Sequence, residues 1–310
     1  YTHIGPSIPN FGAIDCYEFT FYPQSPTTII NRTSGVWNIE DDLWVYNGTL
    51  TFQNNDPVNV GGFLTAGGTT NFSYNTSDAP LNVKYFLWQW PLGGTLFMDS
   101  GHYLNFVPTL YNSNATFYSD SSLYQNIVVN NPNKVYLHSD MRINQSLTLL
   151  NGNIQTITYD TFYVILNTGA IIGGSGYIEG SLVQYVDLAP GPNGGDSPDN
   201  LVVNFPVGTA NGPSPVSVDF SNVTTAGKLT VEAFQSIHPN TINSSETLGR
   251  YWRITKDEDL AFNSADITFN YRPEDFNSTT FTEATDEASM IVGKYDASWS
   301  YPSIFTRTPG

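Results

Sequence analysis

Short apolar runs separated by turn residues recur along the chain, and they are clearest in residues 141–182. There, runs such as Leu147–Leu150, Tyr163–Leu166 and Ala170–Ile172 are separated by Asn-Gly, Thr-Gly and Gly-Gly-Ser-Gly. Apolar runs of this length, bounded by glycine and asparagine, are typical of strands rather than helices. Their recurrence at about 15–20 residues per strand-plus-turn unit predicts the stacked coils of a parallel β-solenoid.

The pattern divides the chain into three parts. Residues 1–34 are rich in proline and contain an alternating stretch, Ile14–Tyr22, which predicts either a strand that caps the first coil or an arm that pairs with a neighbouring subunit. Residues 35–185 predict the solenoid. Residues 186–310 begin with a Pro-, Gly- and Asp-rich loop and continue with longer alternating strands, which predict an antiparallel β-sandwich.

Five segments carry expectations that the fold can test. Continuous strands are expected over Val58–Leu64 and Val83–Trp90 in the solenoid, and over Val202–Val207 and Ser289–Tyr295 in the sandwich. The polar run Glu274–Glu287 predicts a long exposed connection. The overall prediction is an all-β protein in which a parallel β-helix precedes an antiparallel sandwich.

The composition favours an extracellular or cell-surface protein. The net charge is −17, from 11 basic and 28 acidic residues, and such a surface repels nucleic acid and anionic lipid. Only 13% of the residues are charged, and aromatic, Thr, Asn and Gly residues are abundant, as is typical of secreted β-proteins. No apolar run is long enough for a membrane span. A start at Tyr1 without a signal sequence predicts a processed or trimmed terminus.

The single cysteine, Cys16, cannot form an internal disulfide. We expect it to be a buried small apolar residue, with a reactive or intermolecular thiol as the alternative. The histidines lack the spacing of zinc ligands, so the sequence gives no support for a zinc site. They are His3, His102, His138 and His238.

Calcium is the one possible cofactor, because loops rich in Asp and Asn offer the hard oxygen ligands that it requires. The first candidate loop carries Asp187, Asp196 and Asp199, and the second is the run Asp257–Asp259. Neither matches an EF-hand. A solvated acidic loop is the competing interpretation of both.

A polysaccharide-cleaving activity must be weighed, because many β-solenoids hydrolyse or eliminate polysaccharides. The acidic triplet Glu40–Asp42, His102, Arg253 and Lys256 resembles scattered parts of the pectin-hydrolase signature. Arg253 and Lys256 are one residue too far apart for that signature, and they lie in the predicted second domain. A glycosidase also needs two carboxylates at a fixed separation. We therefore expect a non-enzymatic protein without catalytic residues.

Polysaccharide binding is an alternative that needs only exposed aromatic rings. Tyr85, Trp88, Trp90 and Tyr103 could stack on sugar rings. Trp88 and Trp90 alternate on one face of a predicted strand, so core packing is the competing interpretation.

Asn-X-Ser/Thr sequons, which would carry glycans in a glycosylated secreted protein, are spread along the whole chain. They occur at Asn31, Asn47, Asn71, Asn75, Asn114, Asn144, Asn222, Asn243 and Asn277.

Several motifs occur in an order that resembles a known module. They are SDMRINQSLTLLNGNIQT, GGSGYIEGSL, NFPVG, RYWRI, ADITFNY and ASMIVGKYDASW. Together they resemble a secreted β-helix plus β-sandwich module of large bacterial surface proteins and adhesins, of the type that Bacteroidetes export through the type IX route. The resemblance implies a passive stalk without catalytic residues. The chain departs from it in a longer loop at 187–200. No C-terminal export domain follows Trp299, so we expect the chain to be a piece of a larger protein.

These observations predict a structural component of an extracellular filament, sheath or adhesive surface structure. Such a protein would form a homo-oligomer or polymer through unpaired strand edges and the segment 1–34. The alternative is a polysaccharide-binding or polysaccharide-cleaving secreted β-helix protein. A virus or phage surface protein is a weaker third possibility.

Overall fold

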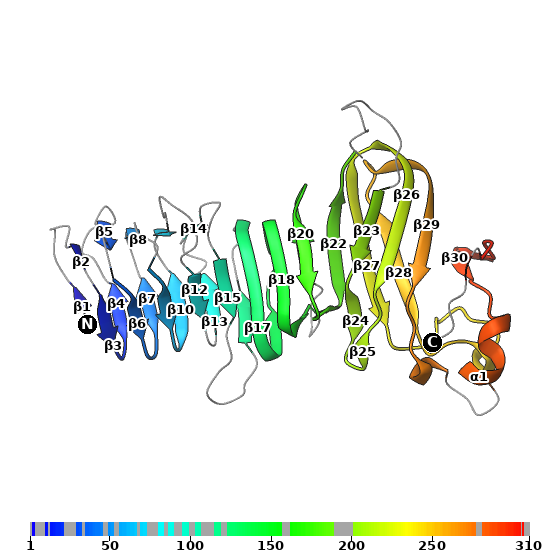
Figure 1. Cartoon of the computed structure of the whole chain (residues 1–310), viewed down its shortest axis with the longest axis horizontal. Coiled ribbons are helices and arrows are strands. Elements are labelled where there is room, and N and C mark those ends of the chain that lie inside the picture. The colour runs from blue at the N-terminus through cyan, green and yellow to red at the C-terminus, as the bar shows by residue number, and fades with distance from the viewer. Residues whose placement is uncertain are drawn as a thin grey trace.

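The computed structural model is an elongated, almost entirely β protein (Figure 1). Coils of short strands occupy one end of the long axis, and two layers of longer strands occupy the other. The described residues are 2–3, 10–11, 13–21, 29–32, 35–45, 49–52, 56–66, 69–72, 80–83, 86–89, 95–98, 103–106, 115–118, 123–156, 162–188, 201–276, 281–304 and 306.

The coils form a three-sided parallel solenoid, as the apolar runs predicted. The first side contains β3 (Ile14–Cys16), β6 (Trp37–Ile39), β9 (Val58–Val60), β12 (Pro80–Val83), β15 (Tyr103–Phe106), parts of β17 (Leu123–Leu137) and β18 (Met141–Gln155), and β20 (Ile171–Gly174). The second side contains β1 (Thr2–His3), β4 (Phe19–Phe21), β7 (Leu43–Val45), β10 (Phe63–Ala66), β13 (Phe86–Gln89), β16 (Ala115–Tyr118), further parts of β17 and β18, β21 (Ile178–Glu179) and β24 (Val207–Thr209).

Two different sets of strands form the third side along the length of the molecule. A separate parallel sheet supplies it at first, with β2 (Asn10–Phe11), β5 (Ile29–Arg32), β8 (Thr49–Phe52), β11 (Thr69–Phe72) and β14 (Thr95–Met98). Further along the chain, the first residues of β17 and β18 are followed by β19 (Tyr163–Leu166) and β22 (Ser181–Val186).

The register of the first side corrects the expected length of a coil. One inward row consists of Ile14, Trp37, Val58, Leu81, Leu104, Ile127, Leu147 and Ile172. Successive numbers differ by 20 (147 − 127) to 25 (172 − 147) residues, and by 23 in most steps. The predicted 15–20 residues were too few because a coil contains three short strands and their corners rather than one strand and one turn.

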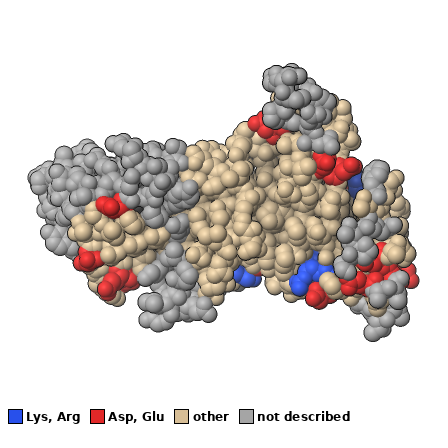
Figure 2. Space-filling model, viewed as in Figure 1, with Lys and Arg blue, Asp and Glu red and all other residues tan. Residues whose placement is uncertain are grey.

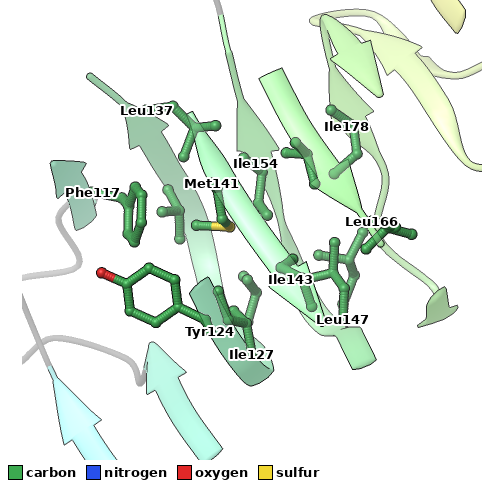
Figure 3. Packing of buried hydrophobic residues seen from close by; sticks show 14 of the residues in the cluster. Phe117, Tyr124, Ile127, Leu137, Met141, Ile143, Leu147, Ile154, Leu166 and Ile178 are labelled. Carbon is green, nitrogen blue, oxygen red and sulfur yellow. The ribbon is translucent and has the colours of Figure 1, made fainter. Parts of the chain in front are cut away.

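The inward rows make the core of the solenoid. Figure 3 shows Phe117, Tyr124 and Ile127 packed beside Leu137 and Met141 between neighbouring coils. These side chains are fully buried. Each coil therefore covers the apolar row of the next, and burial of this kind is the main favourable term in folding.

Two of the expected strands are interrupted at coil corners. Residues 58–64 form β9 and β10, which lie on different sides of the solenoid, because Gly61 and Gly62 turn the chain between them. A Cβ atom on Gly61 would lie only 1.8 Å from the carbonyl oxygen of Glu40 in the preceding coil. The stretch Val83–Trp90 is likewise divided between β12 and β13.

The solenoid continues into the sandwich through β22. This strand pairs in parallel with β19 and antiparallel with β27 (Gly227–Phe234), which pairs with β28 (Tyr251–Lys256). A second antiparallel layer contains β23 (Leu201–Phe205), β26 (Val216–Thr225) and β29 (Ala261–Phe269). The rings of Trp252 in β28 and Phe269 in β29 lie 4.9 Å apart, which places the two layers face to face. Backbone pairing thus crosses residue 186 without a break.

Three expectations for the C-terminal part were wrong. Residues 202–207 belong to β23 and β24 in different sheets, and Pro206, which lacks an N–H group, stands between them. The expected exposed connection at 274–287 includes short helical turns, and Asp275 and Glu287 are buried. The expected strand at 289–295 begins only at Lys294, and it pairs in a small hairpin.

Short elements surround the sandwich. They are β25 (Gly212–Pro213), η1 (Ser244–Glu246), η2 (Pro273–Asp275), α1 (Glu283–Asp286), η3 (Glu287–Ser289), β30 (Lys294–Asp296) and β31 (Ser298–Ser300). In the described part of the chain, no helix is long and apolar enough to cross a bilayer.

Candidate functional site

An outward ladder of amide side chains runs along the first side of the solenoid. Asn38, Asn59 and Asn82 occupy equivalent positions in successive coils, and each Nδ2 donates a hydrogen bond of 2.7 Å to the preceding coil. Asp15 accepts the first of these bonds and terminates the ladder. The ladder therefore ties neighbouring coils together on the outside, where the apolar core cannot contribute.

A second polar ladder lies further along the molecule. The Nδ2 atom of Asn144 donates to Gln125 at 3.0 Å, and the Oδ1 atom of Asn144 accepts from Asn167 at 3.4 Å. Beside it, Ser146 donates to Asn126 at 2.6 Å. Hydrogen bonds between amide side chains of neighbouring coils thus recur further along the solenoid.

One row of register positions on the second side, called the aromatic row below, holds three aromatic residues and one threonine. Trp44, Thr65, Trp88 and Tyr118 are paired through four successive strands. Strands in a sheet are spaced by about 4.8 Å, so the row runs along the long axis of the molecule. Of the aromatic residues singled out from sequence, only Trp88 belongs to this row. Tyr103 lies on the first side, and Tyr85 and Trp90 lie outside the described residues.

Buried charges mark the junction between solenoid and sandwich. Glu232 in β27 is buried, and it accepts hydrogen bonds from Ser181 in β22 at 3.2 Å and from Arg253 in β28. A buried carboxylate is costly unless it is paired and hydrogen-bonded. Glu232 therefore favours an arrangement in which these three strands keep their order.

A second buried carboxylate ties the last coils together. Glu179 in β21 forms an ion pair of 2.6 Å with Lys134 in β17, and it accepts a hydrogen bond of 3.5 Å from Asn153 in β18. Burial raises the pKa of the neighbouring Tyr177 phenol, and the negative charge of Glu179 raises it further. The contact spans three successive coils beside the sandwich.

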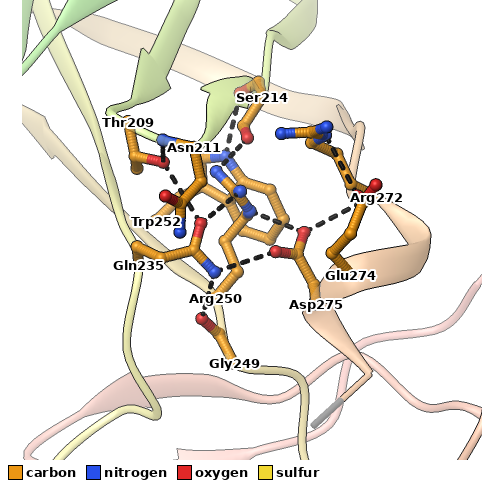
Figure 4. Close-up of polar contacts among 10 residues, drawn as sticks. All are labelled: Thr209, Asn211, Ser214, Gln235, Gly249, Arg250, Trp252, Arg272, Glu274 and Asp275. Atoms are coloured by element: carbon orange, nitrogen blue, oxygen red, sulfur yellow. Dashed lines mark hydrogen bonds and ion pairs between the residues drawn. The ribbon is translucent and has the colours of Figure 1, made fainter.

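The most buried ion pair lies inside the C-terminal part (Figure 4). Arg250 and Asp275 are 0% and 1% exposed, and Nε of Arg250 lies 2.6 Å from the carboxylate. The same guanidinium also donates to Ser214 and Gln235, while Gln235 donates to Asp275 at 3.0 Å. Ser214, Gln235 and Arg250 lie next to the ends of β25, β27 and β28, so the cluster joins these strand ends to η2.

The cluster changes the acidity of Asp275. Burial alone raises the pKa of this carboxyl group, but the hydrogen bonds from Arg250, Gln235 and the Arg272 backbone outweigh it and lower the pKa below its ordinary value. A lowered pKa in the folded state means that ionised Asp275 stabilises the fold. The geometry is that of a closed structural pair, since every donor of Arg250 faces the protein.

The candidate calcium loops are only partly described. Asp187 is exposed and its Oδ1 atom accepts a hydrogen bond of 2.8 Å from Leu188 N–H, whereas Asp196 and Asp199 lie outside the described residues. In the second loop, Oδ1 of Asp257 accepts a hydrogen bond of 3.0 Å from the N–H group of Leu260. Among the residues that the structure describes, no three His, Cys, Asp or Glu side chains converge in a metal-binding group.

The parts of the pectin-hydrolase signature are far apart. The triplet Glu40–Asp42 lies at a corner between β6 and β7, whereas Arg253 and Lys256 lie on β28 at the other end of the long axis (Figure 1). Oδ2 of Asp42 accepts a hydrogen bond from the Trp44 ring nitrogen at 3.2 Å. The structure therefore does not bring these residues into one site, and His102 lies outside the described residues.

The remaining single residues have ordinary surroundings. Cys16 is partly buried in an inward row, and burial raises the pKa of its thiol. His238 packs against the rings of Tyr251, Tyr295 and Trp299.

The described sequons lie on strands or beside a short helix. Asn144 belongs to the second ladder, Asn222 is half-buried with φ of 55°, and Asn243 is exposed and caps η1. Asn31 and Asn71 lie on β5 and β11. The other four, Asn47, Asn75, Asn114 and Asn277, lie outside the described residues.

Charge is unevenly distributed over the described surface. Figure 2 shows acidic side chains near both ends of the molecule and few charged side chains in the middle.

Sequence reasoning missed the ladders and the buried ion pairs. The spacing of Asn38, Asn59 and Asn82 was a usable signal for the first ladder, because it equals the spacing of the coils.

Replacing Asn59 with Asp tests the outer ladder. The substitution removes the donor to Asn38 and places two oxygen atoms against each other, so we expect a loss of about 1–2 kcal/mol in the free energy of unfolding. Asn204→Asp on the exposed side of β23 is the control and should have little effect. Urea unfolding monitored by circular dichroism measures both, and equal effects would contradict a stabilising ladder.

Asp275→Asn tests the buried cluster through pH. The lowered pKa of Asp275 predicts that its stabilisation is present above the ordinary carboxyl pKa and is lost as the pH falls through the lower, folded-state pKa. The wild type should lose more stability than Asp275→Asn between pH 5 and about pH 2. Asp259→Asn, in an exposed turn, should keep the wild-type pH dependence. Thermal unfolding at each pH gives the comparison.

Comparison with known proteins gives no relative for this chain. No family model matches it, no curated protein matches it, and no solved structure matches the fold. The resemblance to secreted bacterial surface modules therefore stays a prediction, and function must be argued from the solenoid, its ladders and its junction with the sandwich.

Proposed function

We propose that this chain is a non-enzymatic structural component of an extracellular filament, sheath or adhesive surface structure. The observation that carries the proposal is one sheet of 21 strands in the described part of the chain, which extends from the first coils through β22 to β28. Because each strand lies across the long axis, the hydrogen bonds between strands run along that axis. The sandwich is thereby joined to the solenoid by backbone bonds as well as by side chains.

Such a sheet resists bending as well as stretching. Bending the solenoid would open the coils on one side, where apolar rows are buried and the amide ladders of Asn38, Asn59 and Asn82 bridge the outer surface. The buried carboxylates of Glu179 and Glu232 also connect neighbouring strands at the junction through hydrogen bonds. A stiff spacer needs these features and needs no reaction centre.

The surface composition supports an extracellular setting for this rod. A strongly acidic chain with few charged residues overall remains soluble by like-charge repulsion while presenting a mostly polar, uncharged surface. A secreted spacer module of the resembled bacterial type would have this character.

Microscopy tests the structural role directly. Purified chain imaged by negative staining at rising concentration should show straight rods that join into longer filaments. Monomers that persist at the highest concentration would contradict assembly, and rods that bend freely in the middle would contradict the spacer role.

The aromatic row on the second side favours one alternative function, the binding of a neutral polysaccharide. Trp44, Thr65, Trp88 and Tyr118 lie in register along the axis, and a linear glycan stacked on such a row would contact several coils at once. The face drawn in Figure 2 carries few charged side chains in its middle, which is compatible with a neutral glycan.

Trp44→Ala tests this alternative. If the row binds glycan, the variant should be retained several-fold less than wild type on insoluble neutral polysaccharide, because a stacking ring is lost. Tyr301→Ala removes an exposed ring outside the row and is the control. No retention of the wild type, or equal retention of all three proteins, argues against binding through this row.

A further inference from the structure

An amine, an amide and a carboxylate converge on successive coils beside the junction with the sandwich. They belong to Lys134 on β17, Asn153 on β18 and Glu179 on β21. Lys134 and Asn153 are register partners on adjacent parallel strands, which lie side by side along the axis (Figure 1). β21 pairs with β18 on its other side. Asn153 therefore lies on the strand between the other two residues.

The ion pair between Lys134 and Glu179 passes over this middle strand. Neighbouring strands are about 4.8 Å apart, so β17 and β21 are separated by about 10 Å. The amine of Lys134 nevertheless lies 2.6 Å from Oε2 of Glu179. The two side chains can meet only over β18, and the long methylene stem of lysine allows this. The amine is thereby placed over the strand that carries the Asn153 amide.

Hydrogen bonds hold the Asn153 amide in one orientation. Its Oδ1 atom accepts the backbone N–H of Tyr177 at 3.0 Å, and its Nδ2 atom donates to Oε1 of Glu179 at 3.5 Å. The flipped amide would set its oxygen against the carboxylate and its NH₂ group against an N–H donor, so the partners decide the orientation. Glu179 thus contacts the Lys134 amine with one oxygen and the Asn153 amide nitrogen with the other.

Close approach of the coils fixes these positions. A Cβ atom on Gly152 would lie 1.8 Å from the carbonyl oxygen of Asn131, and one on Gly176 would lie 2.1 Å from the carbonyl oxygen of Gly152. Gly152 also has φ of 116°, which a residue with a side chain rarely adopts. The corners before Asn153 and Tyr177 are therefore packed backbone against backbone. A rigid scaffold of this kind holds reacting groups in place.

The carboxylate that links the two nitrogen atoms is shielded from water. Glu179 is 6% exposed, although it belongs to the outward positions of its strand. The partly exposed Lys134 side chain lies over it. Bulk water therefore competes little for the contacts of this carboxylate, and its polar partners within the site are the amine and the amide.

We propose that Lys134 and Asn153 become joined by an intramolecular isopeptide bond, with Glu179 transferring the protons. Glu179 removes a proton from the Lys134 ammonium, and the lone pair of Nζ attacks Cγ of Asn153. The Cγ–Nδ2 bond then breaks, and its electron pair leaves with Nδ2. Two protons pass in all from Nζ to Nδ2 through the carboxylate, so the products are a secondary amide and an ammonium ion. Nothing is oxidised or reduced.

Each contact in the site has a part in this reaction. A carboxylate within reach of both nitrogen atoms can act as general base toward the amine and as general acid toward the leaving group. The Tyr177 N–H group donates to the oxygen on which negative charge develops when Cγ is attacked. The reaction takes place once in each molecule and consumes both side chains.

The bond would close the coils next to the sandwich. It would connect β17 to β18 covalently, alongside the backbone hydrogen bonds that run along the axis. Those hydrogen bonds open reversibly under load, whereas an amide does not. The cross-link goes beyond the proposed function, because it forms within one copy and does not require copies to assemble.

The mass of the intact chain tests the bond directly. Denatured wild type should be lighter than its sequence by the mass of one ammonia molecule. Lys134→Arg keeps a cation for Glu179 but is a far weaker nucleophile, and Glu179→Gln keeps the shape but not the proton acceptor. Both variants should show the full sequence mass. Asn144→Ser changes another outward amide on β18 and is the matched control, which should keep the loss.

A tryptic digest identifies the residues that are joined. Cleavage after Lys134 should be lost, and the peptide that contains it should be linked to the peptide that contains Asn153. Wild type with the full sequence mass and normal cleavage at Lys134 would show a simple ion pair and would overturn the proposal. Loss of ammonia without a linked peptide would also overturn it, since an Asn-Gly bond such as Asn151-Gly152 loses ammonia when it forms a succinimide.

The role of Glu179 is tested separately from the bond. A linked peptide that persists in Glu179→Gln would overturn proton transfer by this carboxylate. Filaments in the microscope without a linked peptide would leave the structural function intact and overturn the cross-link. A linked peptide in chains that stay monomeric would support the cross-link and contradict assembly.

Discussion

The register of parallel backbone hydrogen bonds between coils is the constraint on which the rest of this structure depends. A slip of one residue would turn every inward side chain of a strand to the outside, so the apolar rows that include Trp37, Leu104 and Leu147 hold the coils in place. The same register brings Asn38, Asn59 and Asn82 into a ladder, since equal positions in each coil lie directly above one another.

The buried charges lie where this repetition ends. Inside the solenoid each coil covers an equivalent coil, and apolar rows suffice. At the junction a parallel sheet meets antiparallel strands, and paired groups such as Glu232 with Arg253 favour one order of strands. Arg250 and Asp275 do the same for the segment after β29. An ion pair that loses one partner in a buried setting is strongly destabilising, so these contacts disfavour other arrangements.

The proposed role follows from continuity rather than from a reactive site. A sheet that spans both domains transmits force along its hydrogen bonds, and the outer ladders oppose bending. The alternative, glycan binding, would use the same regularity, because the positions in register with Trp44 recur from coil to coil.

The sequence by itself determined the all-β class, the order of solenoid and sandwich, and individual strands such as Tyr163–Leu166, because alternation and turn residues act over a few positions. Tertiary structure decided the length of the coil, the division of 58–64 at Gly61 and of 202–207 at Pro206, and the burial of Asp275. Those features depend on residues about 20 or more positions apart, such as Gly61 against Glu40 and Asp275 against Arg250. Local pattern carries no information about which distant groups will meet, because that is set by how the coils and layers stack.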